Sequence, residues 1–211
     1  IYVHDMSARR DTMNCCLFDV QSVLTGGFEM GNIWYNEPKT LDVAFDVIGD
    51  IVLSAASQQY GGFTVPSVDL ILEPYAEKSY NRALAKYERL GIAADVAEAE
   101  ALADVRKEFE QGFQGWEYKF NTVASSRGDY PFITVTAGTG TGKFAKMATI
   151  TMLEVRRKGQ GKKDHKKPVL FPKIVFLYDE NLHGPGKPLE DVFEAGVECS
   201  AKTMYPDWLS L

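Results

Sequence analysis

Two adjacent cysteines, Cys15 and Cys16, are the residues of this chain best suited by type to redox or radical chemistry. They stand in a short apolar segment, residues 15–20, which predicts a buried strand. Because successive side chains of a strand face opposite ways, at most one of the two thiols can face a given site. A nucleophilic thiol needs a nearby base or cation, whereas a neutral S–H group can give up a hydrogen atom in a shielded site without either. Inert packing of both thiols is the alternative that spacing alone leaves open.

A glycine-rich turn, residues 138–142, leads into Lys143 and is the second candidate for chemistry. The phosphate-loop pattern would need a glycine in place of Ala137 and a hydroxyl in place of Phe144. Two interpretations stay open: a flexible strand-to-helix turn, and a turn whose free amides cradle a phosphate at the helix N-terminus. A phosphate-loop NTPase is a further option, which predicts magnesium-dependent hydrolysis that is lost when Lys143 is changed.

The histidines and the most basic stretch favour structural or solvent-exposed roles. His4, His165 and His183 are scattered and lack the spacing of metal ligands, so no metal site is expected in this chain. The lysine-rich segment 156–167 is typical of a solvated loop.

The elements that must position these residues alternate between strands and helices. After the first strand, apolar spacing predicts helices and strands in the order helix 40–57, helix 66–87 kinked or divided at Pro74, helix 95–120, strand 131–136, helix 143–157, strand 169–178 and helix 188–204. This order predicts an α/β fold with parallel strands joined by helical crossovers.

Composition narrows the function classes. The 211 residues are 45% hydrophobic and 25% charged, enough for one large domain or two small ones. With 23 basic and 29 acidic residues the formal net charge is -6. This argues against nucleic-acid binding through a general positive surface charge, because such binding depends on Lys and Arg neutralising phosphates. Three cysteines cannot make a disulfide framework, so a reducing, cytoplasmic setting is expected. No apolar run reaches the roughly 18 residues of a membrane span, and the chain reads as an interior piece of a longer protein.

Six motifs in register resemble those of the anaerobic (class III) ribonucleoside-triphosphate reductases, and the likeness covers nearly the whole chain. The motifs are YVHD (2–5), NCCLFD (14–19), SQQYGG (57–62), PYAEKSYN (74–81), FPKIVF (171–176) and CSAKTMYPD (199–207). The resemblance implies a ten-stranded α/β barrel of the glycyl-radical type, made of two five-stranded parallel halves. Residues 1–211 would then be the N-terminal half of the catalytic barrel domain. The N-terminal cone, finger loop, zinc site and glycyl-radical region would lie outside this chain.

The resemblance also implies a mechanism. A radical made on a C-terminal glycine passes to a cysteine on the first barrel strand, and its thiyl radical abstracts the 3′ hydrogen of the ribose. Loss of the 2′ hydroxyl as water and re-reduction then give the deoxynucleotide. Cys15 matches that catalytic cysteine, which leaves Cys16 and Cys199 as packing residues.

Further residues are assigned by the resemblance alone. His4, Asp5 and Asn14 match substrate-binding positions, although Tyr2 stands where the family commonly has a histidine. A dNTP or ATP effector would bind between helices at a homodimer interface, and the matching positions are Asn36, Lys39, Asp50 and Arg82. Relatives often show Glu and Gln in place of Asn36 and Asp50. An ordinary surface role for Lys39 and Arg82 is the alternative.

The resemblance names partners and cofactors as well. The substrates would be ribonucleoside triphosphates, and formate or a thiol protein would be the reductant. The glycyl radical would be generated by a separate radical S-adenosylmethionine iron–sulfur activase, and the structural zinc would also lie elsewhere, so this fragment is expected to bind no cofactor and to be inactive alone. No membrane or nucleic acid is expected as a partner. The rival hypothesis is a nucleotide-binding or dimerisation module without catalysis of its own.

Overall fold

A parallel sheet of five strands is the centre of the computed structural model, which describes residues 15–58, 61–122 and 132–211. The strands lie side by side in the order β1 (Cys16–Leu17), β4 (Phe63–Val65), β5 (Ile133–Ala137), β6 (Lys173–Tyr178) and β7 (Asp207–Ser210). Each pairing between neighbours is parallel. Because the order follows the chain and never reverses, right-handed crossovers place the connecting helices on one face of the sheet.

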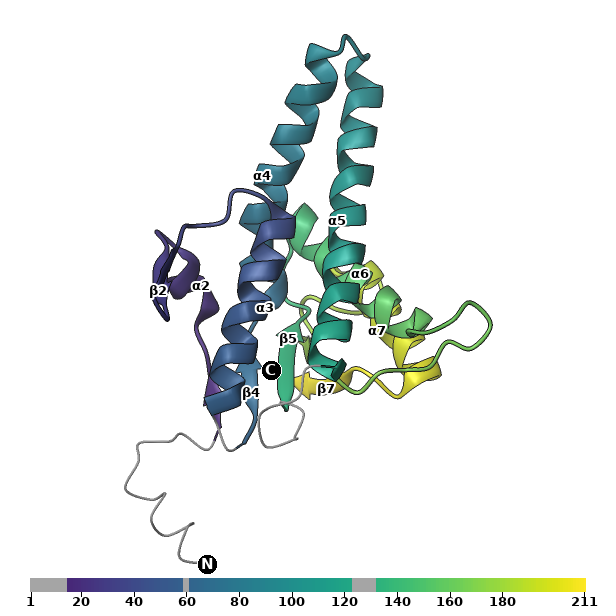
Figure 1. Ribbon diagram of the computed structural model, residues 1–211. Coiled ribbons are helices and arrows are strands. Elements are labelled where there is room, and N and C mark those ends of the chain that lie inside the picture. The colour runs from purple at the N-terminus through teal and green to yellow at the C-terminus, as the bar shows by residue number, and fades with distance from the viewer. Residues whose placement is uncertain (1–14, 59–60, 123–131) are drawn as a thin grey trace, which may run out of the picture.

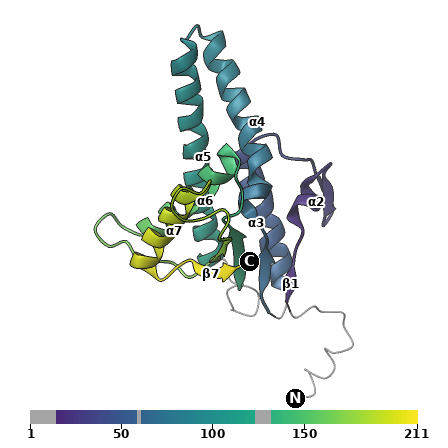
Figure 2. The ribbon, with the colours of Figure 1, turned by 180° about the vertical axis from the view of Figure 1, so that it is seen from behind.

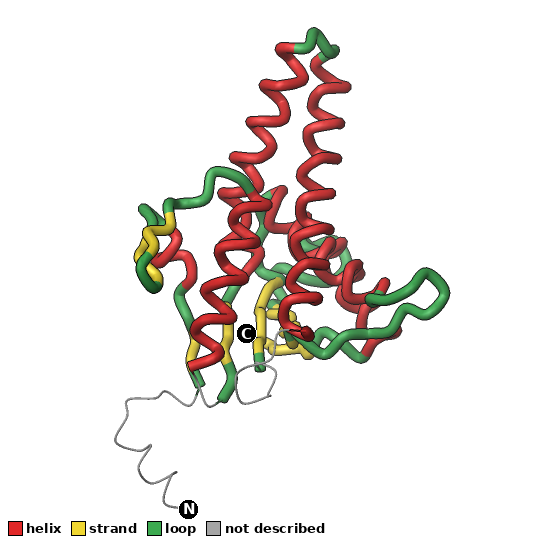
Figure 3. The backbone as a smooth tube through the Cα atoms, viewed as in Figure 1, coloured by secondary structure: helices red, strands yellow, loops and turns green. Residues whose placement is uncertain are grey.

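Those helices cover the sheet and also extend beyond it. They are α3 (Leu41–Gln58), α4 (Val68–Arg89), α5 (Ala94–Thr122), α6 (Lys143–Lys158) and α7 (Glu190–Thr203). Figures 1 and 2 show α4 and α5 running side by side as a long hairpin that projects away from the sheet. The hairpin tip therefore lies far from the strands, on the same side of the molecule as the loop that leads into α3 (Figure 3).

Side chains of the strands alternate between the two faces of the sheet. Phe63, Val65, Ile133, Val135 and Phe176 are almost fully buried against the helices. The opposite side, which we call the open face, is covered by no described helix. It carries the remaining strand side chains, including Leu17, Thr64, Thr134, Thr136, Lys173 and Val175. Leu17 is 76% exposed there, so the open face is a surface in this chain.

The predicted α/β class with parallel strands and helical crossovers is confirmed, but two strands of the parallel sheet were not predicted. The strand β4 has only three residues, and β7 follows α7 where the sequence analysis ends on a helix. A short helix and an antiparallel hairpin follow β1 and were not predicted either, namely α2 (Val20–Leu24), β2 (Phe28–Met30) and β3 (Ile33–Tyr35). The predicted first strand stops early because Asp19 caps α2 by accepting the Ser22 amide.

Two predicted boundaries change for identifiable reasons. Helix α4 continues through Pro74 without dividing. Since Pro74 is exposed, water can reach the carbonyl that loses its helical partner. The strand β6 begins at Lys173 and not at residue 169, because the amides of Leu170 and Phe171 donate to the Asn121 side chain on α5.

A buried ion pair joins two helices to the start of β6. The Arg156 guanidinium on α6 donates from Nε to Glu117 Oε1 on α5 at 2.7 Å, and both side chains are at most 4% exposed. A second nitrogen of Arg156 donates to the Pro172 carbonyl at 2.7 Å. The pair therefore fixes the entry to β6 relative to the helical layer.

We predict that Arg156→Met lowers the free energy of unfolding by about 3–5 kcal/mol, because Glu117 would remain buried as an unpaired charge. Arg156→Met with Glu117→Leu should recover most of that loss. Urea unfolding measures both, with Arg106→Met as the control, since Arg106 is exposed and its partner Glu154 is partly exposed, so the loss there should stay below about 1 kcal/mol. An equal loss in the control and in Arg156→Met would contradict the prediction.

Candidate functional site

The Cys15 thiol lies at the amino edge of the sheet, the edge at which the parallel strands begin. Cys15 is exposed and directly precedes β1. Its sulfur accepts the Gly62 amide at 3.4 Å, from the residue that precedes β4. No imidazole, carboxylate or cation contacts this sulfur within the described ranges. Among the described residues there is therefore no base for a nucleophilic mechanism, and the geometry is compatible with hydrogen-atom chemistry at a neutral S–H group.

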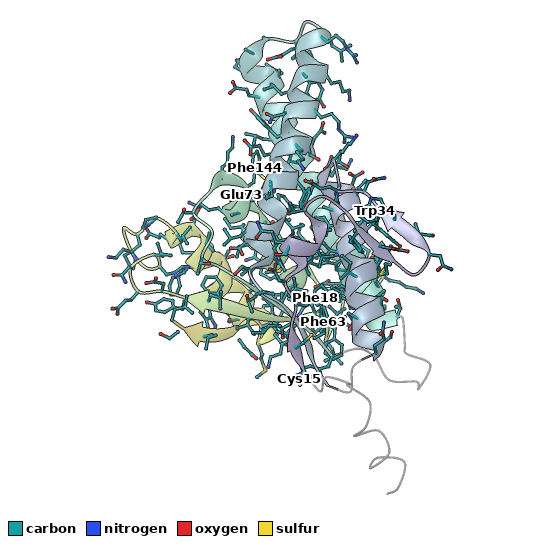
Figure 4. All side chains as sticks on the ribbon, turned by 90° about the vertical axis from the view of Figure 1, so that its left-hand side faces the viewer. Cys15, Phe18, Trp34, Phe63, Glu73 and Phe144 are labelled. Carbon is teal, nitrogen blue, oxygen red and sulfur yellow. The ribbon has the colours of Figure 1, made fainter. Side chains whose placement is uncertain are left out.

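The neighbouring cysteine faces the other way. Cys16 pairs in register with Phe63 and packs, partly buried, against the core. Phe18, two residues further on, also lies on this side, with its ring 5.3 Å from that of Phe63. Figure 4 shows Phe18 and Phe63 together and Cys15 beyond them at the end of the strand. The expected alternation is thus present, with Cys15 directed away from the packing side.

The third cysteine belongs to the core. Cys199 on α7 is fully buried, and its sulfur lies 3.5 Å from Thr203 Oγ1. Burial raises the pKa of the Cys199 thiol, which keeps it protonated and unreactive.

A second polar feature of the amino edge was missed by sequence reasoning. Lys173 opens β6 and forms an ion pair of 2.7 Å with Asp207, which opens β7. Register places Lys173 beside Thr134 on the open face. The alternation of Lys173 with the apolar Ile174 and Phe176 was the signal that could have found it.

The predicted substrate-binding residues His4, Asp5 and Asn14 lie outside the described residues. They remain predictions from the resemblance.

Three of the four predicted effector residues gather where α3 begins. Lys78 on α4 forms an ion pair with Glu37 at 2.7 Å, so the segment that carries Asn36 and Lys39 lies against α4. Arg82 follows one turn later on α4 and lies 3.6 Å from Glu108 on α5. A groove of about 500 Å³ beside Arg82 is lined by Arg82, Lys86, Arg89, Asp104 and Glu108, among others. The arrangement provides cations for the phosphates of a ligand.

The fourth predicted effector residue, Asp50, lies away from the other three. Asp50 is exposed on α3, nine residues beyond Leu41, at which the helix begins. At 1.5 Å per residue this places Asp50 about 13 Å along the helix from Lys39 and its neighbours. One copy of the chain therefore does not bring Asp50 to the other three.

The glycine-rich turn is filled by a side chain of the protein itself. Asp69, fully buried in the first turn of α4, accepts the amides of Gly138 and Gly140 with Oδ2 at 3.1 and 3.0 Å. Glu73 lies beside the start of α6 and accepts the Ala145 amide at 3.4 Å. An anion bound there would meet two carboxylates in place of free amides. The turn is a structural one, and the geometry argues against both the phosphate cradle and the phosphate-loop NTPase.

The residues next to this turn have packing roles too. Phe144 is buried where an NTPase would need a hydroxyl, and the Lys143 ammonium lies over the Tyr80 ring at 5.3 Å from its centroid. Figure 4 shows Phe144 and Glu73 at the base of the long helical hairpin, well away from Cys15. The turn and the thiol therefore do not form one site.

His183 holds the same turn from its other side. The ring is buried, with Nε2 at 2.8 Å from the Gly138 carbonyl and Nδ1 accepting the Asp179 amide at 3.0 Å. Both ring nitrogens are thus used in tying the loop after β6 to the loop after β5. The structural role expected for this histidine is confirmed.

The basic segment 156–167 is a solvated loop only in its later part: residues 156–158 end α6 with Arg156 fully buried, whereas residues 161–167 are exposed as expected. Gln160 and Lys167 exchange two backbone hydrogen bonds at the base of this loop, and His165 lies exposed between them.

Two further features, metal-binding clusters and membrane-spanning helices, concern the part of the chain that the structure describes. That part contains no cluster of three or more His, Cys, Asp and Glu side chains arranged to hold a metal ion. Its helices include none that is both long enough and apolar enough to cross a membrane.

Comparison with known proteins agrees with these features. Residues 1–211 match the family model described as anaerobic ribonucleoside-triphosphate reductase. The enzyme of that name from Enterobacteria phage T4 is 37% identical over 214 residues, which cover 100% of this chain and 34% of the relative. The one from Escherichia coli is 35% identical over 215 residues, with 100% and 29% covered.

Solved structures show the same fold. The anaerobic ribonucleotide reductase from Thermotoga maritima with citrate in the active site has a TM-score of 0.68 at 15% identity, covering 99% of this chain and 38% of that one. The same enzyme in complex with dATP and CTP has a TM-score of 0.65 at 15% identity, covering 99% and 34%.

Fold and site define an α/β protein with a singly wound parallel sheet and a thiol at the start of its first strand. The family match over all 211 residues makes the assignment specific. The chain belongs to the anaerobic ribonucleoside-triphosphate reductase family, and it spans about a third of the length of the curated relatives it matches.

The buried Asp69 leads to a prediction on pH. Burial raises the pKa of its carboxyl above the ordinary 3.8, although the amides of Gly138 and Gly140 oppose the shift. The folded protein therefore holds this proton more tightly than the unfolded chain does, so the contribution of Asp69 to stability is lost as pH rises through the folded-state pKa. Asp69→Asn removes the titration and keeps one oxygen for the glycine amides.

We expect the free energy of unfolding of Asp69→Asn, relative to that of the unchanged protein, to rise from about pH 4 until the pH exceeds the raised folded-state pKa of Asp69, and then to stay constant. Urea unfolding at several pH values measures this difference, with Glu154→Gln, at a partly exposed carboxylate, as the control. A difference that stays constant with pH would show that Asp69 does not titrate in this way.

Proposed function

We propose that this chain is the N-terminal half of the catalytic barrel of an anaerobic ribonucleoside-triphosphate reductase and that Cys15 is its reactive thiol. The observation that carries the proposal is the exposed position of Cys15 at the amino edge of a singly wound sheet, while Cys16 packs against the core. Family membership supplies the reaction, the reduction of ribonucleoside triphosphates.

The chemistry assigned to this chain is a hydrogen-atom exchange at one sulfur. A glycyl radical formed elsewhere in the complete protein by a separate activase takes the hydrogen atom of the Cys15 S–H group. The sulfur radical then accepts the 3′ hydrogen of the ribose, so that an S–H bond forms as the C–H bond breaks. The 2′ hydroxyl takes up a proton and leaves as water, and formate or a thiol protein supplies the two reducing electrons that, with a proton, place a hydrogen on C2′. The hydrogen atom on sulfur then returns to C3′, which restores the sulfur radical. The Gly62 amide orients the sulfur without acting as a base.

The effector residues support regulation by a second nucleotide between two copies of the chain. Asn36, Lys39 and Arg82 lie at one end of α3, and Asp50 lies about 13 Å away along the helix. A partner copy can supply the Asp50 that one chain does not bring to the others. We therefore place the dNTP or ATP effector at a homodimer interface that uses Lys39 of one copy and Asp50 of the other.

We predict that Cys15→Ser in the complete, activated reductase abolishes deoxynucleotide formation and leaves the glycyl radical's EPR signal intact. Exchange of the 3′ hydrogen of tritiated substrate with solvent should cease as well, because the abstracting sulfur is gone. Cys16→Ala is the matched control and should keep turnover, since that side chain only packs.

If Cys15→Ser still exchanged the 3′ hydrogen, or released free base without product, Cys15 would act in the later reduction of the 2′ position and not in abstraction of the 3′ hydrogen. Full turnover would remove it from the mechanism and favour the nucleotide-binding or dimerisation module.

For the shared effector site we predict complementation in a mixed dimer. Lys39→Ala and Asp50→Asn subunits each lose the effector response as homodimers, but a dimer of one with the other keeps one intact site. Equilibrium dialysis of this mixed dimer should find about half as many bound effector molecules as in the unchanged dimer. No recovery would mean that both residues act within one copy or that neither binds the effector.

A further inference from the structure

Lys173 and Asp207 form an ion pair on the open face, whose other strand side chains are apolar or carry hydroxyl groups. Lys173 Nζ lies 2.7 Å from Asp207 Oδ2, and the two side chains come from the first residues of β6 and β7. Lys173 is the only basic side chain in the strands that the structure describes. Sheet faces that become enclosed rarely retain such a group unless it is paired or binds something.

Its place relative to the thiol follows from strand register. Leu17, Thr64, Thr134 and Lys173 form one row across four neighbouring strands. Cys15 stands two residues before Leu17, so it lies on the same face and toward the same edge. Three strand spacings of about 4.8 Å separate the two backbones by about 14 Å across the sheet, and the lysine side chain shortens the gap. A ribose placed over Cys15 could therefore extend its phosphate chain toward Lys173.

The Lys173 ammonium group has N–H donors available for a ligand. One N–H is directed at Asp207, and no other hydrogen bond of this group falls within the described ranges. The hydrogen bond to Asp207 raises the pKa of the Lys173 ammonium, so the positive charge persists across the physiological pH range. A lysine with two available donors is a usual ligand for phosphate oxygens.

Other lysines near the sheet are already occupied. Lys143 lies over the Tyr80 ring, and Lys146 bonds to the Pro188 carbonyl and to Asp191. Both belong to α6, on the covered side of the sheet.

We propose that Lys173 binds the triphosphate of the ribonucleotide on the open face and that Asp207 is a positioning residue that orients its ammonium group. This assignment rests on the proposed function and adds a substrate-binding residue to it. It makes the amino edge of the sheet a site with a thiol for the ribose and a cation for the phosphates.

The test measures binding of labelled CTP to the complete protein by equilibrium dialysis, with saturating dATP present to fill the effector sites. Lys173→Met should weaken CTP binding about tenfold or more, since a charge-assisted bond is lost. Lys173→Arg should restore most of the affinity. The double variant Lys173→Met with Asp207→Asn should stay weak although it leaves no unpaired charge. Lys146→Met is the matched control and should bind as the unchanged protein does, because its similarly exposed pair with Asp191 lies on the helical side.

Cytidine, which has no phosphate, should bind equally to the unchanged protein and to Lys173→Met. Unaltered CTP affinity in Lys173→Met, or equal weakening of CTP and cytidine, would overturn the proposal, as would a change in the KM for formate alone. Absence of turnover in the unchanged, activated protein would instead contradict the proposed reductase, and the CTP affinities would still decide the role of Lys173.

Discussion

A parallel sheet that helices cover on one face only is the constraint on which the rest of this structure depends. Because the strands follow one another in chain order, the crossovers lie together, and none of the described helices covers the other face. The alternation of strand side chains then separates two adjacent cysteines that composition cannot distinguish. Cys16 pairs with Phe63 on the covered side, and Cys15 is exposed at the amino edge. The exposed position of the Cys15 thiol is therefore set by the arrangement of the strands more than by the residues that contact it.

The two edges of the sheet carry different kinds of polar group. At the carboxyl edge, Asp69 and His183 bind Gly138 from opposite sides, so the glycine-rich turn is fixed by buried side chains of the protein itself. At the amino edge, Cys15 and the ion pair of Lys173 with Asp207 remain accessible on the open face. The most conspicuous motif of the sequence thus has a structural role, and the proposed chemistry lies at the other end of the strands.

Sequence reasoning succeeded where periodicity extends over many residues. Helices α3 and α6 were predicted within a residue or two, because their apolar faces repeat over four or more turns. Strands β1 and β4 are too short for alternation to be visible, and β7 depends on pairing with β6, a contact distant in sequence. The carboxylate in the glycine turn was unpredictable for the same reason, since Asp69 lies about 70 residues from Gly138. The thiol that we propose as reactive could be named from the NCC motif, whereas the partner of Lys173 could not.

The central claim is that the open face around Cys15 is the surface that meets the nucleotide. Alkylation of the complete protein by N-ethylmaleimide, with each cysteine followed by mass spectrometry, tests it most directly. The account predicts that Cys15 reacts faster than Cys16 and Cys199, and that a ribonucleoside triphosphate protects Cys15 alone. Equal reaction of Cys15 and Cys16, or modification of Cys15 that the nucleotide does not slow, would contradict it.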